Sequence, residues 1–359
     1  MTGVLVLVGT RKGLFLLEGD DERRAWRLEG PLLPGWSVFH AALDPRDGTI
    51  HAATNNEVYG ATVHRSPDRG ATWTRAEVLG LPEESGLTLE KTWHVEPGRE
   101  GEDGRLWLGA APGALFRTDD GGATWEPVEG ILGHETRDRW YPGAGGLCCH
   151  SIQLDPGEPE RMYVGISAAG VFRSDDGGET WTPANRGTAA DFLPEPWVEV
   201  GQCVHKVLLH PGRPARLWQQ NHCGVYRSDD RGETWERLEG NGLPSGFGFP
   251  LALDHRDPDA ALVVPEEGAE NRVTCNGRLG VYRTRDGGAS WDLRTEGLPA
   301  PAWGAVMREG FASDRLDPPG VYLGTQSGSL FVSPDAGDTW LEAVSQLPPI
   351  LSVEAAEWS

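Results

Sequence analysis

The octapeptide Ser174-Asp-Asp-Gly-Gly-Glu-Thr-Trp181 is one of six copies of the pattern Ser/Thr-x-Asp-x-Gly-x-Thr/Ser-Trp. The terminal tryptophans of successive copies are 49 to 56 residues apart. A regular period near fifty residues is typical of repeat architectures, in which each repeat is one supersecondary unit. The 359-residue chain is therefore predicted to form one closed domain of stacked repeats. The copies are Ser66–Trp73, Thr118–Trp125, Ser174–Trp181, Ser228–Trp235, Thr284–Trp291 and Ser333–Trp340.

The repeat around the third copy is predicted to contain four short strands. The segments 150–155, 162–166 and 170–174 are rich in β-branched and aromatic residues and are separated by polar turns. A fourth strand starts at Thr180, after the Asp-Gly-Gly turn. Four antiparallel strands per repeat are typical of a propeller blade. In the turn, the Asp176 carboxylate can accept hydrogen bonds from backbone N–H groups, and Gly178 can adopt a positive φ. Trp181 can pack against the next blade.

The two chain ends are predicted to build one further blade together. The N-terminus supplies three strands, at 4–8, 13–17 and 25–29, and the segment 350–356 supplies the missing first strand. Such a closure removes the open sheet edges. The predicted fold is an all-β, seven-bladed β-propeller whose closing blade has three N-terminal strands and one C-terminal strand. The predicted blades span 36–79, 90–130, 147–186, 202–240, 248–296 and 303–344, with a closing blade of 4–30 plus 350–358.

The octapeptides resemble the Asp-box, or BNR repeat, and the chain resembles members of the sialidase-like propeller superfamily. That superfamily includes sialidases, xyloglucan-cleaving hydrolases, sortilin-type receptors and photosystem assembly factors, so the fold alone does not define the function. The resemblance implies that the boxes lie on the face opposite the ligand pocket. Sialidases carry an Arg-Ile-Pro motif near the N-terminus, and this chain has none. We therefore do not expect sialic acid cleavage.

Composition restricts the class of partner. The formal net charge is −22 and no basic run occurs, which disfavours nucleic acid and anionic membranes as partners. Five cysteines, an odd number, do not indicate a disulfide framework. The N-terminus reads as a strand and not as a signal peptide. We therefore expect a cytoplasmic protein.

The loops that enter the first strand of each blade carry the unusual residues. These loops are predicted to surround the mouth of the central channel, opposite the octapeptides. Nearly every one contains an aromatic residue, suited to inter-blade packing or to a sugar platform. Arg11 and Arg139 are placed to hold an anionic group. The predicted substrate-binding residues are Trp36, Trp93, Trp140, Tyr141, Trp197, Trp303, Arg11 and Arg139.

Histidines recur at the starts of blades and predict either structural caps or a metal site. Neutral imidazoles that converge from separate blades are good ligands for zinc, copper, iron, nickel or manganese. His150 and His205 each lie five residues before their turn, whereas His40 and His94 lie closer to theirs. Because side chains alternate along a strand, all four can point inward only with bulges. The predicted ligands of one divalent transition metal are His150, His205 and His222, followed by His94 and His40.

Three glutamates are predicted as catalytic carboxylates on the same face: Glu199, Glu57 and Glu270. A glutamate near a metal-bound water can act as a general base. These features predict a hydrolase of glycosyl hydrolase type that acts on a small molecule or a carbohydrate. The alternative is a non-catalytic propeller that binds carbohydrate or a protein partner, because the sequence contains no complete catalytic motif.

Overall fold

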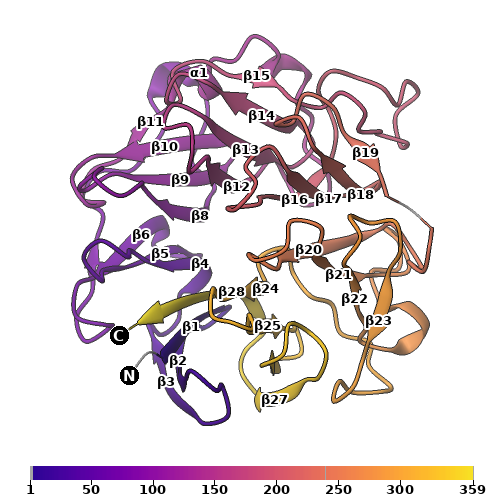
Figure 1. Ribbon diagram of the computed structural model, residues 1–359. Helices are drawn as coiled ribbons and strands as arrows, with labels where there is room; N and C mark the ends of the chain where they lie inside the picture. Colours follow the sequence, from indigo (N-terminus) through magenta and orange to yellow (C-terminus); the bar gives the residue numbers. More distant parts are fainter. Residues whose placement is uncertain (1–2, 239, 359) are drawn as a thin grey trace.

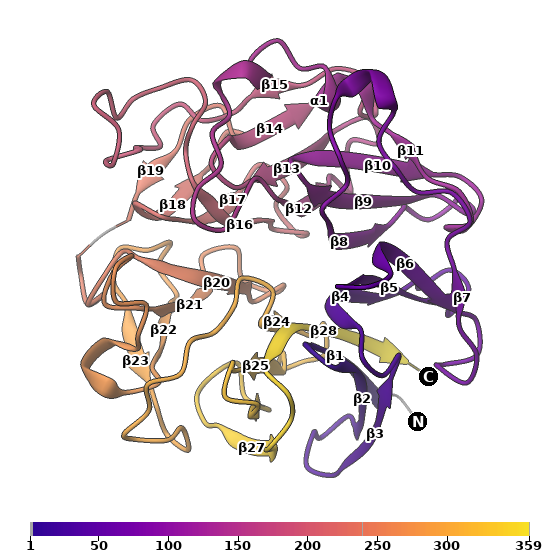
Figure 2. The ribbon, with the colours of Figure 1, turned by 180° about the vertical axis from the view of Figure 1, so that it is seen from behind.

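Seven four-stranded antiparallel sheets are arranged as blades around one axis in the computed structural model, which describes residues 3–238 and 240–358 (Figures 1 and 2). The prediction of a seven-bladed propeller is thereby confirmed. The innermost strands of neighbouring blades contact one another around the whole ring. The helices in the described residues are single turns, and none has the length and apolar character needed to span a bilayer.

The blades follow one another along the chain, each beginning with its innermost strand. Their bounds are β4 (Ser37–Leu43), β5 (Ile50–Asn56), β6 (Gly60–Ser66) and β7 (Thr74–Arg75); β8 (Lys91–Pro97), β9 (Leu106–Ala111), β10 (Ala114–Thr118) and β11 (Glu126–Pro127); β12 (Cys149–Leu154), β13 (Met162–Ile166), β14 (Gly170–Ser174) and β15 (Thr182–Pro183); β16 (Val204–Leu209), β17 (Leu217–Asn221), β18 (Gly224–Ser228) and β19 (Glu236–Arg237); β20 (Gly248–Leu253), β21 (Ala261–Pro265), β22 (Val281–Thr284) and β23 (Asp292–Arg294); β24 (Phe311–Ser313), β25 (Val321–Gly324), β26 (Leu330–Ser333) and β27 (Leu341–Val344). The short helices are α1 (Glu129–Leu132), η1 (Glu83–Ser85), η2 (Arg137–Arg139) and η3 (Cys275–Gly277).

The closing blade combines both ends of the chain in the order β28-β1-β2-β3. Its strands are β28 (Ile350–Trp358), β1 (Gly3–Thr10), β2 (Gly13–Asp20) and β3 (Trp26–Leu32). The antiparallel register of β1 and β28 runs from Gly3 opposite Trp358 to Thr10 opposite Ile350. The predicted closure is confirmed, and it leaves neither terminal strand as an open inner edge.

Antiparallel order gives the ring two distinct faces. The turns between first and second strands lie at one end of each blade, together with the octapeptide turns between third and fourth strands. We call this end the box face. The loops that enter the first strands, together with the turns between second and third strands, lie at the opposite end, which we call the loop face.

Each octapeptide turn is held by hydrogen bonds to its aspartate. In the third copy, the backbone N–H and the hydroxyl of Thr180 donate to the Asp176 carboxylate at 2.9 and 2.5 Å. The Ser174 hydroxyl donates to the same carboxylate at 2.8 Å and accepts the Gly178 N–H. The indole of Trp181 is 7% exposed and donates to the Gly178 carbonyl. The aspartates thus serve as turn acceptors on the box face.

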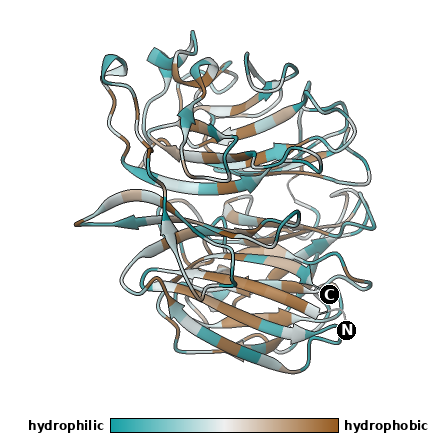
Figure 3. Cartoon of the chain, turned by 90° about the vertical axis from the view of Figure 1, so that its left-hand side faces the viewer, coloured by the Kyte–Doolittle hydropathy of each residue, from teal (hydrophilic) through white to brown (hydrophobic). Residues whose placement is uncertain are grey.

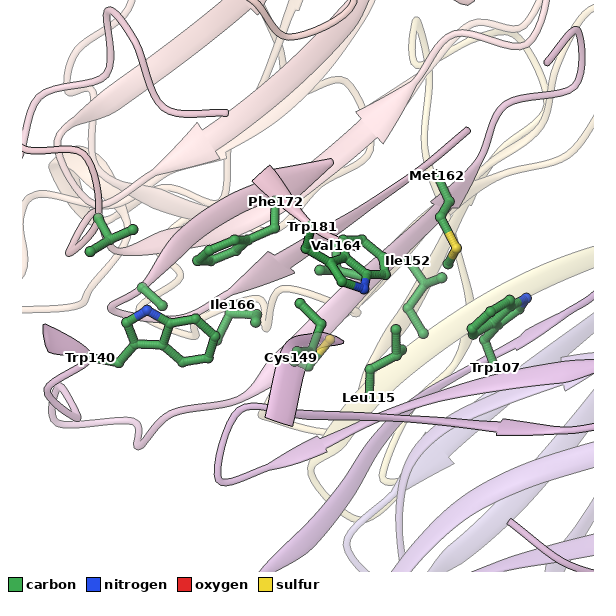
Figure 4. Packing of buried hydrophobic residues seen from close by; sticks show 13 residues of the cluster. Trp107, Leu115, Trp140, Cys149, Ile152, Met162, Val164, Ile166, Phe172 and Trp181 are labelled. Atoms are coloured by element: carbon green, nitrogen blue, oxygen red, sulfur yellow. The ribbon is translucent and has the colours of Figure 1, made fainter. Parts of the chain in front are cut away.

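The hydrophobic core is divided among the contacts between neighbouring blades. One cluster joins the blades β8–β11 and β12–β15, where Trp107, Ile152 and Trp181 pack together with Trp140 and Phe172 (Figure 4). Figure 3 shows the hydrophobic residues concentrated in the strands and the hydrophilic ones in the connecting loops. The strands therefore provide a rigid frame, and the loops can vary without loss of the core.

A bulge near the start of most innermost strands decides which side chains face the axis. The register shifts at Val38/His40 in β4, at Thr92/His94 in β8, at Cys149/Ser151 in β12 and at Val204/Lys206 in β16. His150 and His205 occupy the extra position of their bulges, whereas His40 and His94 follow theirs. The two pairs of histidines therefore hold different positions in the blades.

Candidate functional site

Four buried polar side chains meet at the axis of the ring, and we call them the axial cluster: His40, His94, Lys206 and Glu309. The ammonium of Lys206 lies 2.5 Å from the carboxylate of Glu309. Nδ1 of His94 lies 3.6 Å from the same carboxylate. The rings of His40 and His94 lie 4.0 Å apart between centroids. The residues come from β4, β8, β16 and the segment before β24, so four blades supply the cluster.

The electrostatics of the axial cluster separate its two histidines. Burial opposes the charged form of His94, but Glu309 and Glu96 outweigh burial and raise the pKa of His94 to about 9. Burial and the neighbouring His94 lower the pKa of His40. Burial disfavours ionised Glu309, yet Lys206 and His94 hold the pKa of this carboxyl well below its usual range. The cluster is thus a compensated network with one charged and one neutral imidazole.

The two ends of the axial cluster differ in their access to water. On the side toward the box face, Glu96 contacts His94 at 3.3 Å and Glu354 contacts His40 at 3.6 Å. Their side chains are 35% and 42% exposed, so this side is solvated. On the loop-face side, Arg308 is 7% exposed and lies over Trp93 and Phe249 at 5.3 and 5.8 Å. The guanidinium and the two rings close this end.

A second polar group lies on the loop face and contains Cys203, His205 and His222. Nε2 of His205 lies 3.7 Å from Sγ of Cys203. Nδ1 of His205 donates to the carbonyl of Gly248 at 2.6 Å. The rings of His205 and His222 lie 5.7 Å apart. Cys203 and His222 are half-buried, so the group reaches the surface.

The predicted metal ligands are therefore distributed over two places. His40 and His94 belong to the axial cluster, and His205 and His222 belong to the loop-face group. His150 joins neither group of ligand atoms among the described residues. Its Nε2 donates a hydrogen bond to the carbonyl of Val204 at 2.9 Å, and its Nδ1 forms a hydrogen bond with the hydroxyl of Ser151 at 3.0 Å. The Nε2 contact thus connects β12 to the neighbouring blade, and the Nδ1 contact stays within β12.

Two of the predicted site residues form an ion pair across the loop face. Nη2 of Arg139 lies 2.6 Å from Oε2 of Glu199, and both side chains are more than half exposed. The pair joins the loop that enters β12 to the loop that enters β16. The side chains of Tyr141 and Trp197, from the same two loops, are 74% and 69% exposed. This surface therefore presents aromatic rings and charged groups together.

The other predicted substrate-binding residues lie elsewhere. Trp140 and Trp93 are buried, at 5% and 7% exposure, and pack in the core. Trp36 is half-buried and stacks on Tyr59 with centroids 6.0 Å apart, whereas Trp303 is 62% exposed. Arg11, Glu57 and Glu270 are exposed and come from three different blades.

Sequence reasoning missed four of the buried charged residues: Lys206, Arg308, Glu309 and Glu266. Lys206 directly follows the bulge of β16, the position that His40 and His94 hold in β4 and β8, so alignment with these histidines is the signal that could have found Lys206. Arg308 and Glu309 lie in the segment before β24. Glu266 is 2% exposed, and neither carboxyl oxygen has a hydrogen-bond partner within the described ranges. Burial raises the pKa of Glu266 to about 7 despite the opposing charge of Arg272. The backbone N–H of Glu266 donates a hydrogen bond to the carbonyl of Phe247, which places Glu266 on the loop face.

Comparison with known proteins agrees with the repeats and the fold. The family model for the BNR/Asp-box repeat matches residues 172–183 and 226–237. The chain is 28% identical to a xyloglucanase of Paenibacillus sp over 63% of this chain and 23% of the relative. It is 26% identical to a xyloglucanase of Hypocrea jecorina over 83% of this chain and 37% of the relative. It thus spans well under half the length of either relative.

A solved structure of an ancestral GH74 enzyme is similar in fold. The TM-score is 0.61 at 16% sequence identity, over 86% of this chain and 38% of that chain. At this identity the likeness concerns the fold.

Proposed function

We propose, on the premise that this chain is a seven-bladed propeller of BNR/Asp-box repeats, that it binds and hydrolyses an oligosaccharide on its loop face. The sequence similarity to xyloglucan-cleaving enzymes is the observation that carries this proposal. It suggests a β-linked plant-type glucan or a related oligosaccharide as the substrate class. A single propeller would offer one open face to a sugar chain, whereas the relatives are much longer proteins.

The surface around Arg139 and Glu199 supports the location. Tyr141 and Trp197 project from the two loops that the ion pair joins. Exposed apolar surface rimmed by charged groups is typical of binding sites. The aromatic faces would stack on the sugar rings, while Arg139 and Glu199 would hydrogen-bond their hydroxyl groups.

Hydrolysis of a glycosidic bond usually needs one protonated carboxyl and one carboxylate. Glu266 lies on the loop face, burial raises its pKa to about 7, and we take it as the candidate for the protonated carboxyl. Glu199 would serve as the second carboxyl group. Glu57 and Glu270 are further exposed carboxylates of this face and belong in the same set of variants.

The test is formation of new reducing ends from xyloglucan and from a panel of soluble β-glucans by the purified full chain. Glu199→Gln should lower the rate by at least about a hundredfold if this carboxylate takes part in acid–base chemistry. Trp197→Ala should weaken binding of the oligosaccharide.

The matched control is Glu233→Gln. Glu233 also pairs with an arginine, Arg173, at 2.6 Å, and its side chain is 61% exposed, but it lies on the box face. This variant should keep full activity. Binding without turnover would replace the hydrolase by a carbohydrate-binding propeller. Absence of both binding and turnover across the panel would overturn the proposal.

A further inference from the structure

The loop-face group of Cys203, His205 and His222 has the composition and spacing of a metal site. One ligand atom from each residue can be chosen so that all three lie within 4.8 Å of one another. His205 lies in β16, Cys203 directly precedes this strand, and His222 comes from the turn between β17 and β18 of the same blade. One sheet therefore fixes all three positions.

The separation of two ligand atoms fits a tetrahedral ion. A zinc ion bound to sulfur at about 2.3 Å and to nitrogen at about 2.05 Å holds these atoms about 3.6 Å apart. Sγ of Cys203 and Nε2 of His205 are 3.7 Å apart. A hydrogen bond from the thiol to the imidazole would also fit this distance, but it would not involve His222.

The imidazole of His205 is already oriented for coordination. Its Nδ1–H donates to the carbonyl of Gly248 at 2.6 Å, which leaves Nε2 as the nitrogen that faces Cys203. Histidines that bind metals commonly donate their second N–H to a carbonyl in this way. Phe249 stacks on His205 with centroids 4.4 Å apart, and Phe247 contacts both His205 and His222. The aromatic rings thus restrict both imidazoles.

The axial cluster is the competing candidate, and its charges favour a different state. His40, His94 and Glu309 also bring ligand atoms within 4.8 Å. There, however, the ammonium of Lys206 lies 2.5 Å from the carboxylate that a metal would need. A cation bound at Glu309 would have to displace this ammonium. The charges of Arg308 and Arg272 act on Cys203 and His205, but in the described part of the chain neither arginine forms a hydrogen bond or an ion pair with these sulfur and nitrogen atoms.

We propose that Cys203, His205 and His222 bind one zinc ion. Zinc suits a mixed set of one thiolate and two imidazoles, and three protein ligands leave a fourth position for water or a substrate. That position would open toward a surface hollow beside His222, lined by Asp191, Phe192, Cys223, Arg237, Gly246 and Phe247. The proposal does not depend on carbohydrate hydrolysis.

The test is zinc binding by the purified, untagged full chain. Protein stripped with a chelator is dialysed against zinc sulfate and analysed by plasma mass spectrometry. The expected result is about one equivalent per chain. Cys203→Ser and His222→Ala should each lose this equivalent. Cobalt(II) should give a thiolate-to-metal absorption band that is absent in Cys203→Ser.

Control variants separate this site from general effects. Cys275→Ser and His255→Ala, which change a cysteine and a histidine outside the group, should retain the zinc. Circular dichroism and melting of every variant confirm that the fold is intact. No bound zinc in the wild type, zinc retained by both ligand variants, or loss of zinc only on Glu309→Gln would each overturn the assignment.

Discussion

The ammonium of Lys206 and the carboxylate of Glu309 are 2.5 Å apart at the axis of the ring, and the two side chains are only 8% and 4% exposed. The residues are 103 positions apart in the sequence, so this ion pair connects the blade that starts with β16 to the blade that starts with β24. Lys206 and His94 together compensate the charge of Glu309.

Removing one member of this pair should destabilise the fold. Glu309→Gln leaves the Lys206 charge buried without its carboxylate, and the expected loss of unfolding free energy is about 3–5 kcal/mol. The measurement is urea unfolding followed by tryptophan fluorescence. Glu354→Gln is the control, because its side chain is 42% exposed and its loss should cost at most about 1 kcal/mol. Equal effects of the two variants would contradict the role of Glu309.

The contribution of His94 to stability should decline at alkaline pH. Its pKa in the folded protein is about 9, above the value of about 6.5 expected after unfolding. The stabilisation by protonated His94 is therefore complete below about pH 6.5 and is lost as the pH rises through 9. The difference in unfolding free energy between wild type and His94→Gln should shrink between pH 6 and pH 10, by up to about 3 kcal/mol.

A second histidine gives the control for this pH series. Burial lowers the pKa of His51 to about 4, so this residue is neutral throughout that interval. The effect of His51→Gln should therefore stay constant from pH 6 to pH 10. An NMR titration of the His94 ring in the wild type measures its pKa directly, and a value near or below 6.5 would refute the prediction.

Two aromatic residues from the loops that enter β12 and β16 should respond differently to truncation. Trp140 is 5% exposed, packs on Phe172 with centroids 5.0 Å apart and donates to the Thr136 hydroxyl at 2.9 Å. Trp140→Ala should cost about 3–5 kcal/mol because it opens a cavity. Trp197 is 69% exposed, so Trp197→Ala should change the stability by less than about 0.5 kcal/mol. Thermal melting distinguishes the two, and a strongly destabilised Trp197→Ala would show that this ring packs in the fold.

The octapeptide aspartates should make the fold sensitive to acid. Burial opposes ionisation of Asp120, but hydrogen bonds from Thr124, Thr118 and Ala123 together outweigh it and lower the pKa of Asp120 to about 2. A carboxyl with a depressed pKa stabilises the fold above about pH 4 and loses this contribution as the pH falls through 2. Asp120→Asn should cost about 1 kcal/mol at pH 7, since the turn is solvent-exposed, and almost nothing at pH 2. Unfolding at the two pH values measures this, and an equal cost at both would contradict it.

The sequence by itself determined the repeats, the number of blades and the way the ring closes. This was possible because each octapeptide turn is held by contacts between residues close in the sequence. The Asp176 carboxylate, for example, accepts hydrogen bonds from residues at most four positions away. The strands on either side of a turn are also short and read directly from the residue pattern. Sequence reasoning gave Arg139 and Glu199 separate predicted roles, as a substrate-binding and a catalytic residue, and their ion pair at 2.6 Å follows from the fold.

Only the tertiary structure decided which polar side chains meet inside the ring. His150 and His205 are the bulge residues of their strands, whereas His40 and His94 lie one position after the bulge residue, and one position along a strand reverses the direction of a side chain. Glu309 gave no local signal, and its ion pair with Lys206, 103 positions away, forms only after distant blades close around one axis. A local pattern can specify a turn, but a contact across the ring depends on register and closure together.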